Sequence, residues 1–87
     1  MDSKDIVQIA KALGDPIRWE ILQVLRGREK CVCELLEVFE LKQPNLSYHL
    51  KILSEAGLLI GRQDGKWNHY KVDEVTLREF SKSIIDI

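Results

Sequence analysis

Two cysteines carry the most distinctive chemistry in this chain of 87 residues. Cys31 and Cys33 are separated only by Val32, and the chain has no other cysteine. Thiolates select soft, thiophilic ions, so a Cys-x-Cys pair is a candidate ligand set for such an ion. The simpler alternative is that both side chains only pack at the start of a helix. We expect no disulfide, because neighbours this close would close a strained ring, and we therefore expect a reducing, cytoplasmic setting.

Helix geometry limits how these two thiolates could act together. Residues two apart in a regular helix project ~200° apart, so both sulfur atoms reach one ion only if that turn is irregular or unwinds. The same pair could instead be oxidised, and a thiol-redox switch is therefore a rival to ion binding. A cadmium site completed by Glu29, Glu34 or Glu37, or a mercury ion held by the two thiolates, also stays open.

A second chemically distinctive region is the basic middle of the chain. The formal charge of −1, from 13 basic and 14 acidic residues, argues alone against nucleic-acid binding. Residues 41–71, however, carry five basic and two acidic residues, and acidic segments flank them. A local excess of positive charge matters more than the total for docking on phosphate. The charge distribution therefore favours a nucleic-acid surface in this region.

Candidate DNA-contacting residues lie on a helix that begins near Pro44 and on the hairpin after it. With Leu46, Leu50 and Leu53 facing inward, the exposed positions hold side chains suited to base edges or phosphates. Arg62 and Lys66 in the hairpin have a spacing suited to phosphates. His49 falls near the edge of the apolar face, where a bond to backbone is as reasonable as a contact with DNA. The complete candidate set is Gln43, Asn45, Ser47, Tyr48, His49, Lys51, Arg62 and Lys66.

Apolar spacing and punctuation predict the elements that position these residues. A first helix covers residues 3–13, and Asp15 and Pro16 begin a second that stops at Gly27. A third helix carries apolar residues at i, i+3, i+4 and i+7 from Val32, and a fourth ends at Gly57. Two strand-prone runs, 58–63 and 66–72, flank Asp64-Gly65 as a hairpin, and Asp73 caps a fifth helix.

This order predicts a mainly α fold with one β-hairpin (α+β), arranged ααααββα as a winged helix-turn-helix. We expect one domain over residues 1–87, with the helix-turn-helix at about 31–57 and the wing at about 58–72. Helices 3–13 and 73–87 would form a homodimer through Ile6, Ile9, Leu13, Leu77, Phe80 and Ile84. We assign Trp19 to the core, and Trp67 and Tyr70 to packing within the hairpin.

Other function classes fit less well. No phosphate loop, carboxylate pair or nucleophile with a base stands out, which argues against an enzyme. The longest apolar run, at 57–61, is far shorter than the ~20 residues of a membrane helix, and the acidic N-terminus is no secretory signal. A winged-helix module that binds protein instead of DNA stays open as an alternative.

Several segments resemble the ArsR/SmtB family of winged-helix repressors. Residues 13–22 are similar to its opening helices, and residues 55–59 and 65–72 to its wing. Its recognition helix is resembled by Gln43-Pro44-Asn45-Leu46-Ser47-Tyr48-His49-Leu50-Lys51-Ile52-Leu53. Cys31-Val32-Cys33-Glu34-Leu35 resembles the metalloid site of its arsenic-responsive branch. The resemblance implies a homodimer that binds operator DNA and dissociates when arsenite or antimonite binds Cys31 and Cys33.

The chain departs from the family pattern at two places. Arsenic-responsive members often carry a third cysteine three residues after the second, where this chain has Leu36. A third ligand for arsenic would then be water, a small cellular thiol or a group from the other subunit. Zinc, nickel and cobalt sensors of the family use histidines on the last helix, and residues 73–87 contain none.

Overall fold

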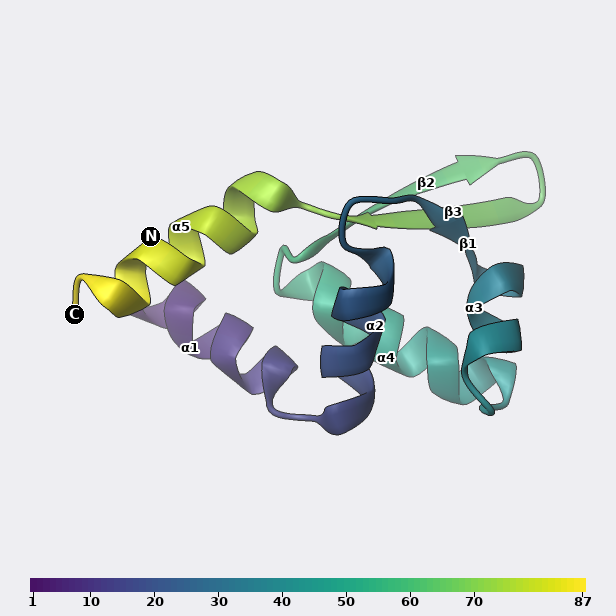
Figure 1. The fold of residues 1–87 in the computed structure, drawn as a ribbon, viewed down its shortest axis with the longest axis horizontal. Helices are drawn as coiled ribbons and strands as arrows, with labels where there is room; N and C mark the ends of the chain where they lie inside the picture. The colour runs from purple at the N-terminus through teal and green to yellow at the C-terminus, as the bar shows by residue number, and fades with distance from the viewer.

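The computed structural model describes residues 1–87 and contains five helices and three strands. Figure 1 shows them in chain order: α1 (Ser3–Leu13), α2 (Pro16–Leu25), β1 (Lys30–Cys31), α3 (Val32–Val38), α4 (Gln43–Glu55), β2 (Leu59–Asp64), β3 (Trp67–Val72) and α5 (Glu74–Ile85). The predicted winged helix-turn-helix class is confirmed. The structure adds one strand, β1, to the predicted order.

β1 joins the hairpin to form an antiparallel sheet with the order β1-β3-β2. Lys30 lies opposite Tyr70, and Cys31 lies opposite His69. A strand of two residues has too few positions to show a period-2 pattern, which is why its sequence did not predict it. The strand places the first cysteine on the wing sheet rather than in a helix.

Aspartate side chains fix the starts of three helices. Asp2, Asp15 and Asp73 each accept a hydrogen bond from a backbone N–H in the first turn of α1, α2 and α5. At α2 the bonds from Ile17 and Arg18 N–H are 2.9 and 3.2 Å long, and Pro16 follows the cap. The Arg18 N–H bond is the main reason that the pKa of Asp15 lies below its ordinary value of 3.8.

Two glycines shape the connection from α4 into the wing. Gly57 (φ +83°) follows the α4 C-cap as predicted, and Leu58 N–H donates to Leu53 O at 3.0 Å, closing a Schellman motif. In the hairpin, Asp64 belongs to β2 and the two-residue turn is Gly65-Lys66, one residue later than predicted. Of these two turn residues only Gly65 has a positive φ (+60°), as a type II′ turn requires.

The core is formed by thirteen buried apolar residues, to which α1, α2, α3, α4, β2 and β3 contribute and β1 and α5 do not. Leu46, Leu50 and Leu53 of α4 are at its centre, each at most 1% exposed. Ile9 is also 1% exposed, so it belongs to this core and not to the predicted dimer surface. Trp19 was expected in the core and is instead half exposed, because it lines an open hollow between α2 and α5.

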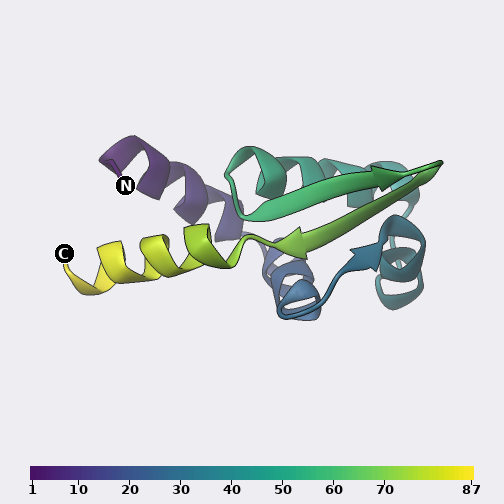
Figure 2. The ribbon, with the colours of Figure 1, turned by 90° about the horizontal axis from the view of Figure 1, so that it is seen from above.

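The molecule is elongated, with extents of 40 × 23 × 19 Å. Helices α1 and α5 lie side by side at one end, where both chain termini are found, while α3 and the wing tip lie at the other (Figures 1 and 2). None of the five helices has the length and apolar character needed to span a membrane. The end with α1 and α5 is thus well separated from the end with the cysteines.

Candidate DNA-binding surface and thiol pair

The outer face of α4 presents most of the predicted DNA-contacting residues. The structure places five of them at exposed positions, namely Gln43, Asn45, Ser47, Tyr48 and Lys51. Lys51 is 77% exposed and its Nζ lies 3.8 Å from Glu55 Oε1, one turn away. The N-cap, Lys42, makes no side-chain capping bond, so no side chain occupies the N–H groups at this helix start. The face is accessible, polar and open at its N-terminal end.

Lys66 lies in the hairpin turn, beside the exposed ring of Trp67. Its Nζ is 5.4 Å from the centroid of that ring, at cation–π distance, and it makes no ion pair. The ammonium is therefore available for an anionic partner.

His49 differs from its neighbours on α4, because its ring is half-buried against α2. Its Nδ1 lies 3.2 Å from Arg18 Nη1, and since a guanidinium only donates, Nδ1 accepts this bond. Arg18 also donates from Nε to Ala12 O at 2.6 Å and from Nη2 to Lys11 O at 3.5 Å. The structure thus joins His49 to the end of α1 through Arg18, away from the exposed face.

Arg62 also has a protein partner. Its Nη2 donates to Glu29 Oε1 at 2.7 Å, and its Nε lies 3.1 Å from the same atom. His69 Nδ1 lies 3.9 Å from this carboxylate. The hydrogen bonds from Arg62 hold the pKa of Glu29 below its ordinary range, and the carboxylate in turn raises the pKa of Arg62. A phosphate would have to compete with Glu29 for this side chain.

The expectation of no disulfide is wrong for this structure, in which the sulfur atoms of Cys31 and Cys33 are bonded to each other. Their Cα atoms are 5.3 Å apart, within the ordinary range for a disulfide. Cys31 has extended backbone (φ −80°, ψ 162°) and is the N-cap of α3, whereas Cys33 is in the first turn. The sequence-based geometry assumed that both residues were helical.

The strand-to-helix junction also corrects the requirement for an unwound helix. Because Cys31 precedes α3, both sulfur atoms lie on one side of the backbone while the helix stays regular. Cys31 Sγ accepts a bond from Glu34 N–H at 3.3 Å, and Glu34 Oε1 accepts from Cys31 N–H at 3.0 Å. The sulfur atom therefore takes part in a capping box that fixes the start of α3.

No cluster of three or more His, Cys, Asp or Glu residues that could hold a metal ion is found in the chain. The nearby carboxylates have other partners, since Glu29 binds Arg62, and Glu34 caps α3 and lies 3.9 Å from Lys30 Nζ. Both of these carboxylates are therefore engaged by other groups of the chain.

A small cavity separates Cys33 from the exposed start of α4. It has a volume of about 230 Å³ and lies between α3, α4 and the wing. We call it the α3–α4–wing cavity; its walls include Cys33, Leu36, Gln43, Ser47, Lys66 and Trp67. Three of these six residues are candidate DNA contacts, so the cavity lies between Cys33 and the candidate DNA surface.

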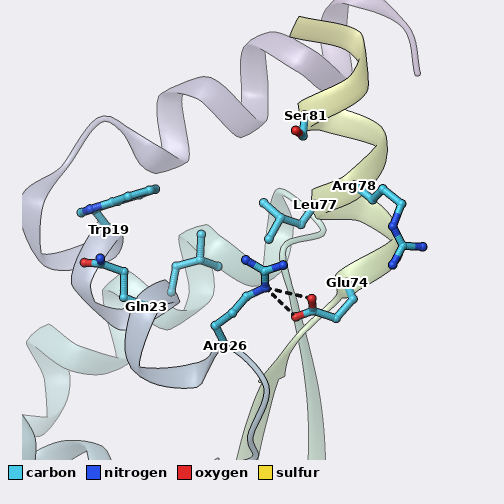
Figure 3. A pocket seen from close by; sticks show the side chains of 8 residues that line it. Trp19, Gln23, Arg26, Glu74, Leu77, Arg78 and Ser81 are labelled. Atoms are coloured by element: carbon cyan, nitrogen blue, oxygen red, sulfur yellow. Dashed lines mark hydrogen bonds and ion pairs between the residues drawn. The ribbon is translucent and has the colours of Figure 1, made fainter. Parts of the chain in front are cut away.

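The largest hollow, about 620 Å³, lies elsewhere, between α2 and α5. Figure 3 shows Arg26, at the end of α2, reaching Glu74 of α5 through hydrogen bonds of 2.8 and 3.1 Å. The exposed ring of Trp19 lies on the α2 side of this hollow. Neither cysteine nor any candidate DNA contact lines it.

Sequence reasoning missed the contacts of Arg18 with His49 and of Glu29 with Arg62. Arg18 stands three residues after the cap Asp15, and the spacing alone shows only a polar helical position. Glu29 is 33 residues from Arg62, so their contact depends on the strand pairing of β1 with the wing. Only the register of the sheet could have indicated this pair.

Comparison with known proteins identifies the family. Residues 15–60, more than half of the chain, match the family model described as "Bacterial regulatory protein, arsR family". The chain belongs to the ArsR family. An HTH-type transcriptional regulator of Methanocaldococcus jannaschii is 36% identical over 92% of this chain and 91% of its own length. The arsenical resistance operon repressor of Staphylococcus aureus is 37% identical over 97% of this chain and 81% of its own.

The same fold is found in solved structures of ArsR-type proteins. The homodimeric winged helix-turn-helix DNA-binding domain of a possible ArsR-family regulator from Mycobacterium bovis superposes with a TM-score of 0.80. It is 24% identical, and the match covers 94% of this chain and 77% of that one. This ArsR-family protein is a transcriptional repressor with a winged helix-turn-helix DNA-binding domain, and its homologues are regulators, not enzymes.

Proposed function

We propose that this ArsR-family repressor binds operator DNA in the cytoplasm as a homodimer and releases it when trivalent arsenic or antimony binds Cys31 and Cys33. The observation that carries the proposal is the convergence of the two sulfur atoms at the strand-to-helix junction. Two thiolates on one side of the backbone are a chelating pair for a soft, thiophilic ion. The name of the Staphylococcus aureus relative supports arsenic as that ion.

The exposed start of α4 is the proposed base-reading element. Gln43, Asn45, Ser47 and Tyr48 are exposed in the first half of this helix, the part of a recognition helix that reads base edges. Lys51 and Lys66 would contact phosphates, as would Arg62 once it exchanges Glu29 for DNA. His49 would position α4 rather than touch DNA, because its Nδ1 is bonded to Arg18.

The proposed dimer uses the end of the molecule formed by α1 and α5. Helix α5 has no buried residue in the isolated chain, although apolar side chains recur along it. Val75, Ile84 and Ile85 are 61, 45 and 79% exposed, and Val7 on α1 is 51% exposed. A second copy would cover these side chains and give the two-fold symmetry that a palindromic operator requires. The homodimeric state of the Mycobacterium bovis domain supports a dimer of this fold.

The capping role of Cys31 supplies a path from inducer to DNA. Exchange of the S–S bond for two As–S bonds would move the two sulfur atoms apart and shift Cys31 Sγ relative to Glu34 N–H. The start of α3 then loses part of its capping box, and α3 is the helix that precedes α4 across a short turn. Release requires that the inducer bind the DNA-free state more tightly than the DNA-bound state.

A thiol-redox response is the second candidate function, favoured by the bonded sulfur atoms in the structure. An operator-release titration of reduced protein under anaerobic conditions would distinguish the two, with arsenite, antimonite, cadmium, mercury, zinc and hydrogen peroxide added in parallel. Metalloid sensing predicts release by arsenite and antimonite, and no release from Cys31→Ser or Cys33→Ser protein that still binds DNA. Release by peroxide alone would replace metalloid sensing with the redox function.

A further inference from the structure

We infer that the α3–α4–wing cavity binds a small thiol that carries a carboxylate, and that its sulfur atom is the third ligand of the metalloid held by Cys31 and Cys33. The inference rests on the proposed function and adds a second ligand to it. Three observations support it: the lack of a third donor, the position of the cavity beside Cys33, and the free polar groups on its walls.

The chain itself leaves one bond of the metalloid unfilled. Trivalent arsenic forms three bonds, and this chain supplies two sulfur atoms with no further His, Cys, Asp or Glu completing a cluster. Leu36, one turn after Cys33, lines the same cavity and offers no donor atom. Soft ions prefer thiolate over oxygen ligands, so the third ligand is best supplied by a thiol from outside the chain.

The cavity has the place and size for such a molecule. Cys33 forms part of its wall, so a metalloid bonded to this sulfur would lie at the cavity edge. Its volume of about 230 Å³ is below the ~300–1,000 Å³ of pockets for drug-sized ligands, which points to a compact occupant such as cysteine. Val32, Leu36 and Trp67 would cover the carbon atoms of that molecule.

The polar part of the cavity wall explains the choice of a carboxylate. Lys66 lines the cavity and makes no ion pair within the chain. The side chains of Gln43, Ser47 and Asn68 also line it, and none of them makes a hydrogen bond within the chain. An ammonium with three neighbouring polar groups fits the carboxylate and amino group of an amino-acid thiol.

The chemistry balances without any further reactant. Two molecules of the small thiol first reduce the Cys31–Cys33 disulfide, giving two protein thiols and one small-molecule disulfide. Arsenous acid then exchanges its three hydroxyl groups for the sulfur atoms of Cys31, Cys33 and a third thiol molecule. Three As–O bonds break, three As–S bonds form, and the three thiol protons leave in three molecules of water. The arsenic stays trivalent throughout this exchange.

The position of the cavity would make this complex a direct competitor of DNA. Gln43, Ser47 and Lys66 line the cavity and are also candidate DNA contacts. A thiol bound to them would occupy groups that a base edge or a phosphate needs. The bound thiol would therefore give the metalloid complex its preference for the DNA-free state.

The test uses full-length protein that is reduced, freed of reductant by desalting and kept under argon. Arsenite is added alone, with cysteine, or with cysteamine, which has the thiol but no carboxylate. Native mass spectrometry measures which species form, and fluorescence anisotropy measures operator release. We expect a ternary protein–arsenic–cysteine species, and an arsenite concentration for half-release at least tenfold lower with cysteine than without a thiol.

Lys66→Met provides the test of the carboxylate contact. We expect this substitution to weaken the binding of cysteine to the protein–arsenic complex by about fivefold, as loss of a partly exposed ion pair would. The binding of cysteamine to the same complex should be unchanged. Lys51→Met removes an exposed lysine outside the cavity. It should not change the binding of either thiol to the protein–arsenic complex. Circular dichroism of both variants checks their folding.

Two results separate the inference from the proposed function. Equal release with and without thiol, from a binary protein–arsenic species, would overturn the inference and leave metalloid sensing intact. Absence of any arsenic-bound species in all three arms would overturn metalloid sensing itself, and the inference with it.

Discussion

At the scale of single residues, Arg18 makes the largest number of connections between elements. Its side chain is 13% exposed and donates to two carbonyl groups at the end of α1 and to His49 on α4. The carbonyl groups of Ala12 and Lys11 at the end of α1 are therefore bonded to a charged side chain instead of to water. A single residue of α2 thus links α1, a proposed dimer helix, to α4, the proposed reading helix.

We expect Arg18→Met to lower the free energy of unfolding by ~1.5–3 kcal/mol, because it leaves partly buried carbonyl groups without a charged donor. His49→Gln should cost less than His49→Leu, since the glutamine oxygen can still accept from Arg18. Urea unfolding followed by circular dichroism measures all three variants. Equal stability of Arg18→Met and the natural protein would show that these bonds contribute nothing.

A second residue prediction concerns acid stability at Asp15. The pKa of this carboxyl is lowered in the folded protein, mainly by the Arg18 N–H bond. Ionised Asp15 therefore stabilises the fold at pH values above the ordinary pKa of 3.8. That stabilisation is lost as the pH falls through the lower, folded pKa. Asp15→Asn keeps a capping oxygen but does not titrate. We therefore expect the stability difference between the two proteins, measured by urea unfolding at pH 6 and pH 3, to shrink at the lower pH.

At the scale of elements, the sequence predicted the helix ends that local residues mark and missed the strand that forms only by pairing with a distant one. Asp15, Pro16 and Gly57 are local signals, and the α2 start and the α4 end lie where they indicate. β1 has two residues and exists through its bonds to β3, about 40 positions later in the chain. Missing it placed Cys31 inside a helix, and that error reversed the expected geometry of the thiol pair.

The exposure of the α4 site residues followed from helical periodicity alone, but the partners of His49 and Arg62 did not. Periodicity shows which side of its own helix a residue occupies, and not which charged group of another element lies opposite. The thiol pair was found from composition and spacing, whereas the cavity beside it needs three elements in place. Its outline could not be predicted from the sequence.

The β1–wing pairing yields a prediction about DNA affinity. Glu29 holds Arg62 by hydrogen bonds as short as 2.7 Å. Glu29→Gln should free the guanidinium for a phosphate, strengthen binding to any DNA sequence and make it more dependent on salt. The double variant Glu29→Gln/Arg62→Ala should lose this gain. Anisotropy titrations at several salt concentrations would measure both effects, and an unchanged affinity of Glu29→Gln would show that Arg62 does not reach DNA.

At the scale of the whole molecule, the proposed sensing site and the proposed dimer surface lie at opposite ends. Helices α1 and α5, which carry exposed apolar side chains, lie at the end of the molecule opposite α3 and the wing tip (Figure 2). Helix α4, the proposed reading helix, is connected to α1 at the proposed dimer end through Arg18 and through Gln8, whose Nε2 donates to Glu55 O at 3.2 Å. The distance between the two reading helices of a dimer would depend on these contacts.

We expect Ile84→Glu to convert a dimer into a folded monomer, because it puts a charge into the apolar face of α5. Val38→Glu is the matched control, since Val38 is 53% exposed on α3 at the opposite end. Sedimentation velocity at micromolar concentration measures the assembly state. A dimer that survives Ile84→Glu would move the interface away from this part of α5.

The α3–α4–wing cavity also bears on how several promoters could share one repressor. When an inducer and an operator compete for Gln43, Ser47 and Lys66, each lowers the affinity of the other by the same factor. The inducer concentration that empties an operator then rises in proportion to how tightly that operator is held. Weakly held promoters would open at a trace of toxin and strongly held ones only at a heavy dose. A cell could thus set an order of gene expression by changing operator sequences alone, with the repressor left as it is.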